Sequence, residues 1–357
     1  HDTLNVGVQG SSPWGSTKIV LYSLLKYDES VFEITQRPIW FFRVVCQFSG
    51  KNSLYLSGKI LNNMKYATTL DEQVDKLKNR GLVINDEEKA KEVLLDIGYY
   101  RFGAYLFPFE KKYPSKKNRD HVYKDGTDFY DALALYYFDC DLRRLLMKYL
   151  TRIEVNIRTY ITYYVSNLYK TKPCWFISHS VMKPSYVNSF YATVYSTKAF
   201  QDNPTIIEHH KKYPMDRYAP AWKTIELMTI GNIQSLYNNL KKPDVQADIA
   251  LHYGVAKIGI FQSYFETIRK ARNMCAHGNV LFDTKLPQRL PHGPAGNLTQ
   301  PDNSNIIGII AVIQYIIKQI SVHRYQEMCE ELKNLLKKVE NGKVREILKN
   351  VSGFETF

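Results

Sequence analysis

The stretch Arg269-Lys-Ala-Arg-Asn-Met-Cys-Ala-His-Gly-Asn-Val-Leu-Phe-Asp283 gives the clearest signal in the chain. The residues before it predict a helix with one apolar face, because apolar side chains recur at three- and four-residue steps: Ile258, Phe261, Tyr264, Phe265, Ile268 and Cys275. Gly278 is well placed to end that helix. Arg272, Asn273 and His277 therefore fall at the end of a core helix, where a side chain is held firmly and still reaches solvent.

The spacing of these polar residues limits how they can act together. Residues five apart on a regular helix point about 140° away from each other, so Arg272 and His277 do not share a face. Either the helix loosens before Gly278, or the two groups meet across an interface. Asn273 lies four residues before His277 and shares its face, so its amide can orient the imidazole.

The residue types indicate phosphoryl chemistry without a metal or another cofactor. Histidine titrates near neutrality and can move protons. Arginine can hold a phosphate with a planar fork of donors.

Two other segments accompany this stretch. One runs from Thr68-Thr-Leu-Asp-Glu-Gln-Val-Asp-Lys-Leu-Lys-Asn-Arg-Gly81 to Ile97-Gly-Tyr-Tyr-Arg-Phe-Gly-Ala-Tyr105, and the other is Pro220-Ala-Trp-Lys-Thr-Ile-Glu-Leu-Met-Thr-Ile-Gly231. Together with Arg272–His277 and the following Leu281-Phe-Asp283, they resemble the Abi-like (abortive infection) version of the HEPN-superfamily RNases. The three segments lie in the family's order.

The resemblance implies an all-α HEPN-type helical bundle with additional helices and long loops. It also implies a homodimer in which two Arg-x4-His motifs face each other across a cleft. The implied activity is a metal-independent endoribonuclease: the RNA 2′-hydroxyl attacks its neighbouring phosphate, His277 assists proton transfer, Arg272 stabilises the added negative charge and Asn273 orients His277. The implied setting is phage defence or a toxin, with a small regulatory RNA as a second partner. Gly278 departs from the family pattern, because many relatives carry a second polar residue there.

Composition agrees with a cytoplasmic protein that binds an acidic partner. The 357 residues carry a net charge of +13, which favours nucleic acid first and an anionic membrane second, and we expect no membrane partner. A generally basic surface that aids solubility explains the same charge. Five cysteines are scattered without a Cys-x-x-Cys pair, which indicates reduced thiols rather than a disulfide framework or a zinc site.

Three regions are expected: residues 1–63, the Abi-like region 64–285, and C-terminal helices in 286–357 that complete the bundle. We expect residues 1–63 to be a non-native or poorly structured extension. Val8–Thr17 back-translates to a sequence that contains the pattern of a tRNA T-arm, so our hypothesis is an upstream tRNA gene read through in frame, with the natural start at Met64. The alternative is a real extension in which Ile39–Val45 forms a strand or a buried helix, too short to span a membrane.

Helix signals become regular after Met64. Thr69 and Glu72 form a capping-box pattern, and Asn85 with Glu88 predicts the start of the next helix. Residues 128–169 show the strongest apolar stripe, with a break expected near Asp139–Asp141. Further helices are predicted at about 185–200, 204–212, Pro220–Leu240, from Pro243 to near Gly254, Asn305–Ile320, and one or two within 322–350.

Two features of this region have open alternatives. Glu154 and Arg158 are four apart on the long stripe, which favours a local ion pair, but Glu154 could instead orient a catalytic side chain if this helix lines the cleft. The basic cluster Lys111, Lys112, Lys116, Lys117 and Arg119 is either a solvated loop or an RNA-backbone contact. Packing is favoured over base stacking for the aromatic residues in 99–109.

Two other classes of function remain open. One is a non-catalytic RNA-binding or regulatory protein on the same fold, and the other is a protein-binding defence regulator with a basic surface. RNA binding without cleavage would indicate the first, and no RNA binding would indicate the second.

Overall fold

The structure, a computed structural model, describes residues 66–287, 290–296 and 304–354. The described helices all belong to one compact unit, Ala67–Phe357, which is divided from His1–Tyr66 at the start of the chain. The predictions made for residues 1–63 lie outside the described residues.

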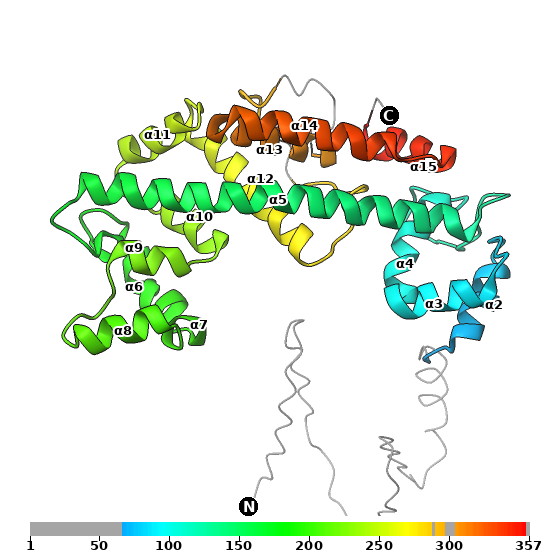
Figure 1. Ribbon diagram of the computed structural model, residues 1–357, viewed down its shortest axis with the longest axis horizontal. Helices are drawn as coiled ribbons and strands as arrows, with labels where there is room; N and C mark the ends of the chain where they lie inside the picture. The colour runs from blue at the N-terminus through cyan, green and yellow to red at the C-terminus, as the bar shows by residue number, and fades with distance from the viewer. Residues whose placement is uncertain (1–65, 288–289, 297–303, 355–357) are drawn as a thin grey trace, which may run out of the picture. The chain divides into compact units, whose positions relative to one another are not determined.

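The described residues form an all-α fold, which confirms the predicted fold class (Figure 1). Pairing between extended segments is limited, in this part of the chain, to isolated bridges such as that between Val83 and Asp128. The α-helices are α2 (Leu70–Lys78), α3 (Glu87–Ile97), α4 (Tyr99–Leu106), α5 (Phe129–Leu168), α6 (Pro184–Phe190), α7 (Lys198–Gln201), α8 (Pro204–Lys212), α9 (Ala221–Thr224), α10 (Ile230–Asn238), α11 (Pro243–His252), α12 (Ile258–Ala276), α13 (Ile306–Ile320), α14 (Val322–Lys337) and α15 (Gly342–Ile347).

Helix α5 is the element against which most others pack. Its 40 residues begin at a capping box in which Asp128 caps the helix and the Asp131 side chain binds back to the cap. The stripe of buried apolar residues along it contacts α4, α12, α13 and α14. The break predicted near Asp139–Asp141 is wrong, because the Asp139 carboxylate turns into the protein and is bound there by groups from other segments.

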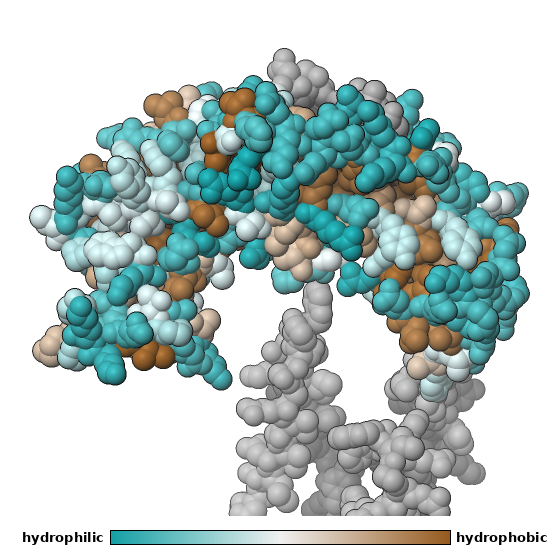
Figure 2. Space-filling model, in the orientation of Figure 1, coloured by the Kyte–Doolittle hydropathy of each residue, from teal (hydrophilic) through white to brown (hydrophobic). Residues whose placement is uncertain are grey.

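The C-terminal helices cover α5 and α12. Helix α13 is apolar on most of its surface and packs between α12, α5 and α14, so it is a core helix, one of the two placements predicted for it. Hydrophilic side chains cover much of α14, whereas hydrophobic ones gather over the region of α3 and α4 (Figure 2). Within the described residues, no helix combines the length and the apolar character needed to cross a membrane.

Local capping explains where prediction and structure differ in detail. The Thr69–Glu72 capping box is present, but Asp86 rather than Asn85 caps α3, since its side chain accepts a hydrogen bond from the Lys89 amide at 2.9 Å. Pro220–Leu240 is not one helix: Met228 is extended, and Thr229 caps a new helix. The helix predicted at 185–200 is likewise divided, into α6 and α7.

Candidate functional site

The polar motif lies where α12 ends. The helix is regular through Ala276, His277 is its C-terminal cap with φ −92° and ψ 4°, and Gly278 takes the left-handed backbone with φ +65°. Gly278 therefore ends the helix as predicted, and the helix does not loosen before it. The His277 side chain lies at an exposed position, whereas Arg272, five residues earlier, is half-buried against α5.

A row of ion pairs fixes Arg272. Its Nε donates to Oε2 of Glu154 on α5 at 3.1 Å. The other carboxylate oxygen of Glu154 accepts from Nη2 of Arg158 at 2.9 Å, and the same nitrogen lies 3.0 Å from the carbonyl oxygen of Met228. Glu154 thus makes the local ion pair with Arg158 and also contacts Arg272, and its role in orienting a catalytic side chain stays a prediction.

Asn273 contacts Arg272 within this single chain. Its Oδ1 accepts a long hydrogen bond of 3.4 Å from Nη1 of Arg272. Both Asn273 and His277 are among the described residues, and no hydrogen bond joins their side chains there; the backbone amide of His277 donates to the Asn273 carbonyl at 2.9 Å. The predicted role of Asn273 in orienting His277 therefore stays a prediction.

The loop that follows His277 is held by side chains from two other helices. Nη1 of Arg101, on α4, donates to the Gly278 carbonyl at 2.7 Å. Nη1 of Arg143, on α5, donates to the Asn279 carbonyl at 3.1 Å. These two arginines fix the backbone directly after the motif.

Asp139 is the third anchor of this loop, and it is fully buried. Its carboxylate accepts from the backbone amides of Leu281 at 3.1 Å and Phe282 at 2.9 Å, and from the Tyr105 hydroxyl at 2.8 Å. Arg143 pairs with the same carboxylate, four residues along α5. Burial alone would lower the pKa of Arg143, but the Asp139 charge and the Tyr105 hydroxyl raise it, so Arg143 remains cationic.

Sequence reasoning missed Arg101, Tyr105, Asp139 and Arg143. The available signal was the position of Asp139, which falls among the buried apolar residues of α5 rather than on its exposed face. A carboxylate on a buried face requires partners, because an unpaired buried charge is very costly. That signal was interpreted as a helix break.

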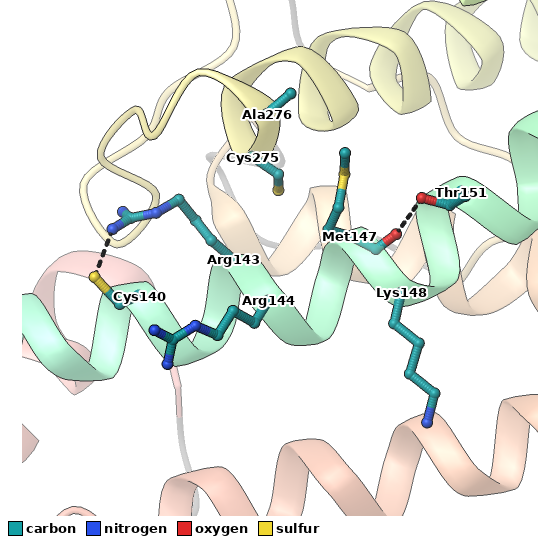
Figure 3. A pocket seen from close by; sticks show the side chains of 8 residues that line it. All are labelled: Cys140, Arg143, Arg144, Met147, Lys148, Thr151, Cys275 and Ala276. Carbon is teal, nitrogen blue, oxygen red and sulfur yellow. Dashed lines mark hydrogen bonds between the residues drawn. The ribbon is translucent and has the colours of Figure 1, made fainter.

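An open groove of about 640 Å³ runs between α5 and the end of α12 (Figure 3). Cys140, Arg143, Arg144, Met147, Lys148 and Thr151 line it from α5, and Cys275 and Ala276 line it from α12. Burial raises the pKa of the Cys275 thiol to about 12, so this cysteine is protonated at neutral pH and is not a nucleophile. The groove therefore offers basic and apolar surface beside His277.

The basic cluster predicted to contact RNA is largely paired with acidic residues. Lys111 contacts Asp125 and Lys112 contacts Asp120, each at 2.9 Å, and Arg119 binds Glu110 through two nitrogens. The remaining members, Lys116 and Lys117, have exposed side chains. Among the described residues, no group of three or more His, Cys, Asp or Glu side chains could hold a metal ion.

The three segments singled out in the sequence meet at this site. Arg101 and Tyr105 come from the first, Met228 comes from the second, and the end of α12 is the third. Fold and site together define an all-α protein with an arginine and a histidine presented at one helix end.

The family model described as Abi-like protein matches residues 92–283, and the chain belongs to that family. Family membership suggests a role in abortive infection, a form of phage defence. The search of curated proteins gave no match. The search of solved structures gave none either.

Proposed function

We propose that this protein is a metal-independent endoribonuclease that acts in phage defence or as a toxin. The observation that carries the proposal is the end of α12, where Arg272 is fixed by Glu154 and His277 is exposed one turn later. This pair of side chains lies inside the region that the Abi-like family model matches. The net charge of +13 supports an acidic substrate.

In the proposed reaction, the RNA 2′-hydroxyl attacks the adjacent phosphorus and the 5′-oxygen of the next nucleotide leaves. The products are a 2′,3′-cyclic phosphate and a 5′-hydroxyl. His277 assists proton transfer, typically a contribution of about 10²–10⁴-fold. Arg272 stabilises the extra negative charge on the phosphorane, and Glu154 keeps its guanidinium in place without neutralising it fully, since three further nitrogen-bound protons stay available.

The proposed site is assembled from two copies of the chain. Because α12 is regular through Ala276, Arg272 faces α5 while His277 lies at an exposed helix end. In a symmetric pair, His277 of one protomer can face Arg272 of its partner. The groove between α5 and α12 then leads the substrate, or a small regulatory RNA, toward the site. Arg144 pairs with Asp141 but is largely exposed and adds positive charge there. Lys148, in contrast, is paired with Glu327 and Glu331.

The first test is cleavage of total RNA by purified protein in EDTA, beside His277→Ala and Arg272→Ala. Cleavage by the wild-type protein alone, with cyclic-phosphate ends, is the expected result. Equal cleavage by all three proteins would contradict the assigned residues. Tight RNA binding without cleavage would instead indicate the non-catalytic RNA-binding class, and no binding would indicate a protein-binding regulator.

The second test separates a shared site from two independent ones. The two inactive variants are mixed, allowed to exchange partners and assayed together. If the site combines Arg272 of one protomer with His277 of the other, mixed dimers keep one intact site, and about a quarter of the wild-type activity returns with random pairing. No recovery, with exchange verified by differently tagged protomers, would show that both residues act within one chain.

A further inference from the structure

A second cavity is lined in part by the loop that follows His277 and shares no lining residue with the groove already described. Its volume is about 500 Å³, and it is bounded by α4, by the end of α2 and by the segment around Arg119–Tyr123. Val280 and Asp283, which follow His277 by a few residues, form part of its wall. The cavity is therefore next to the backbone that Arg101 and Asp139 hold.

Part of the cavity lining is aromatic. Tyr99 and Tyr100 line it, and the Tyr100 side chain is 98% exposed although it is large and partly apolar. The Tyr99 hydroxyl accepts from Nη1 of Arg80 at 3.2 Å, which fixes the ring. Tyr99 is half-buried, so Tyr100 is the exposed ring. An exposed ring beside cationic groups is the combination with which proteins stack unpaired nucleobases.

The polar part of the cavity lining carries more positive than negative groups. Arg80, Lys116 and Arg119 line it together with two carboxyls, Glu110 and Asp283. The Glu110 carboxylate accepts two hydrogen bonds from Arg119 and lies 3.0 Å from Nδ1 of His121. Lys116 makes no direct hydrogen bond or ion pair in the described part of the chain, so its ammonium is available for a phosphate.

Asp283 adds a carboxyl to the cavity wall. Burial raises the pKa of this carboxyl above its usual range, against the opposing charges of Lys116 and Lys285. Its oxygens can accept a hydrogen bond from the edge of a base. The cavity thus combines stacking surface, an edge-reading group and a cation.

We propose that this cavity binds one unpaired nucleotide of the RNA, with its base against Tyr99 and Tyr100 and its phosphate at Lys116. The proposal rests on the proposed function in one respect: the bound nucleotide would then lie next to the cut phosphate and set the base preference. Because Val280 and Asp283 join the cavity directly to the motif loop, RNA leaving His277 has a short path into it.

Gly103 allows a test that removes no charge. It lies on α4, lines the cavity, and an added Cβ would meet no atom within 4 Å. Gly103→Leu therefore fills space where a base would lie, at a helical position that tolerates a side chain. Lys116→Ala removes the proposed phosphate contact, and Lys117→Ala is its matched control, because Lys117 is the exposed neighbour that does not line the cavity.

Binding is measured in a His277→Ala background with each nucleoside 5′-monophosphate and with inorganic phosphate. We expect at least one nucleotide to bind, with affinity at least tenfold weaker after Gly103→Leu or Lys116→Ala and unchanged after Lys117→Ala. Phosphate binding at equal strength to every nucleotide would overturn the proposal, because the aromatic wall would then contribute nothing. If Gly103→Leu loses its helical circular dichroism signal together with binding, Lys116→Ala decides, because Lys116 is at an exposed position and its substitution should not disturb folding. Unchanged nucleotide binding by Lys116→Ala would then overturn the proposal.

The cleavage assay then separates this inference from the proposed function. If the active protein cuts RNA and Gly103→Leu changes the sequence found at the cut sites, the result supports both the nucleotide site and the nuclease function. Cutting with an unchanged sequence preference would overturn the nucleotide site and leave the nuclease. Nucleotide binding that depends on Lys116, in a protein that never cuts RNA, would retain the site and overturn the nuclease.

Discussion

Helix α5 carries two acid–arginine pairs at the same four-residue spacing, Asp139–Arg143 and Glu154–Arg158, and the protein uses them differently. The Asp139 carboxylate is fully buried and binds two backbone amides and a tyrosine hydroxyl. The Glu154 carboxylate is 12% exposed and binds a second arginine, Arg272, whose side chain is 33% exposed. The first pair therefore fixes backbone, and the second holds a cation that still reaches solvent.

The difference shows that spacing predicts which residues pair but not what the pair is for. The role depends on what surrounds the carboxylate. The Asp139 carboxylate is held in one position by backbone amides. Glu154 binds only Nε of Arg272, so other guanidinium nitrogens of Arg272 can bind a ligand. Four predictions test this contrast, in order of decreasing effect.

Asp139→Ala should cause the largest loss of stability. Removing this carboxylate leaves Arg143 buried without its partner and frees the amides of Leu281 and Phe282, so we expect a loss of about 3–5 kcal/mol in the free energy of unfolding. Chemical denaturation measures it. Asp141→Ala, which removes an exposed pair with Arg144, is the control and should change stability by less than about 0.5 kcal/mol. Equal effects of the two variants would contradict the assigned role of Asp139.

Glu154→Ala should reduce stability less than Asp139→Ala does, and it should reduce the rate of RNA cleavage. The hydrogen bonds lost are charge-assisted, which corresponds to about 1.5–3 kcal/mol, and Arg272 loses the contact that positions it. We expect RNA cleavage to fall while helix content and folding are retained. Thr159→Ala, at an exposed position of the same helix, should leave both unchanged. If Glu154→Ala folds and cuts RNA at the wild-type rate, the positioning role is wrong.

Glu110 is another buried carboxylate, and its contribution to stability depends on pH. Burial would raise its pKa, but hydrogen bonds from Arg119 and His121 outweigh that and hold the pKa below 4.5. A folded-state pKa below the unfolded value contributes stability at neutral pH, and that stability is lost as the pH falls below 4.5 through the folded-state pKa. The free energy of unfolding of Glu110→Gln, measured across about pH 3–6, should therefore depend less steeply on pH than that of the wild-type protein. An unchanged slope would contradict a lowered pKa of Glu110 in the folded protein.

Lys148→Ala should have the smallest effect. Lys148 contacts Glu327 at 2.8 Å and Glu331 at 2.6 Å, but its side chain is 42% exposed. Pairs at such positions contribute about 0–1 kcal/mol, and salt weakens them further. Thermal unfolding at low and high salt should show a small loss that disappears at high salt. A loss of stability as large as that caused by Asp139→Ala would contradict the expected difference between buried and exposed ion pairs.

The sequence predicted the helices well where apolar periodicity and caps agree. The long stripe became α5, Thr69 and Glu72 formed their capping box, and Gly278 ended α12. It failed where tertiary partners decide. The break predicted near Asp139–Asp141 is absent because the donors to Asp139 come from residues 105, 281 and 282, which no local pattern connects to it.

The site was predicted in the same uneven way. The positions of Arg272 and His277 at a helix end followed from periodicity. One of two alternatives for Glu154 was that it orients a catalytic side chain, but its contact with Arg272 in particular was not predicted. The convergence of Arg101, Tyr105 and Met228 on the same region could not be predicted, because it depends on how α4 and the segment before α10 pack against α5. The pairing of the basic loop with Asp120 and Asp125 was missed for a similar reason.

The unbroken course of α5 has a consequence for how such a protein can change during evolution. Asp139 and Glu154 are fifteen positions apart on one rigid rod, so each residue inserted between them would rotate one anchor by about 100° relative to the other. A single inserted residue would separate the motif loop from the support of Arg272. Insertions and deletions should therefore collect in the connections between helices, and the interval from 139 to 154 should keep its length.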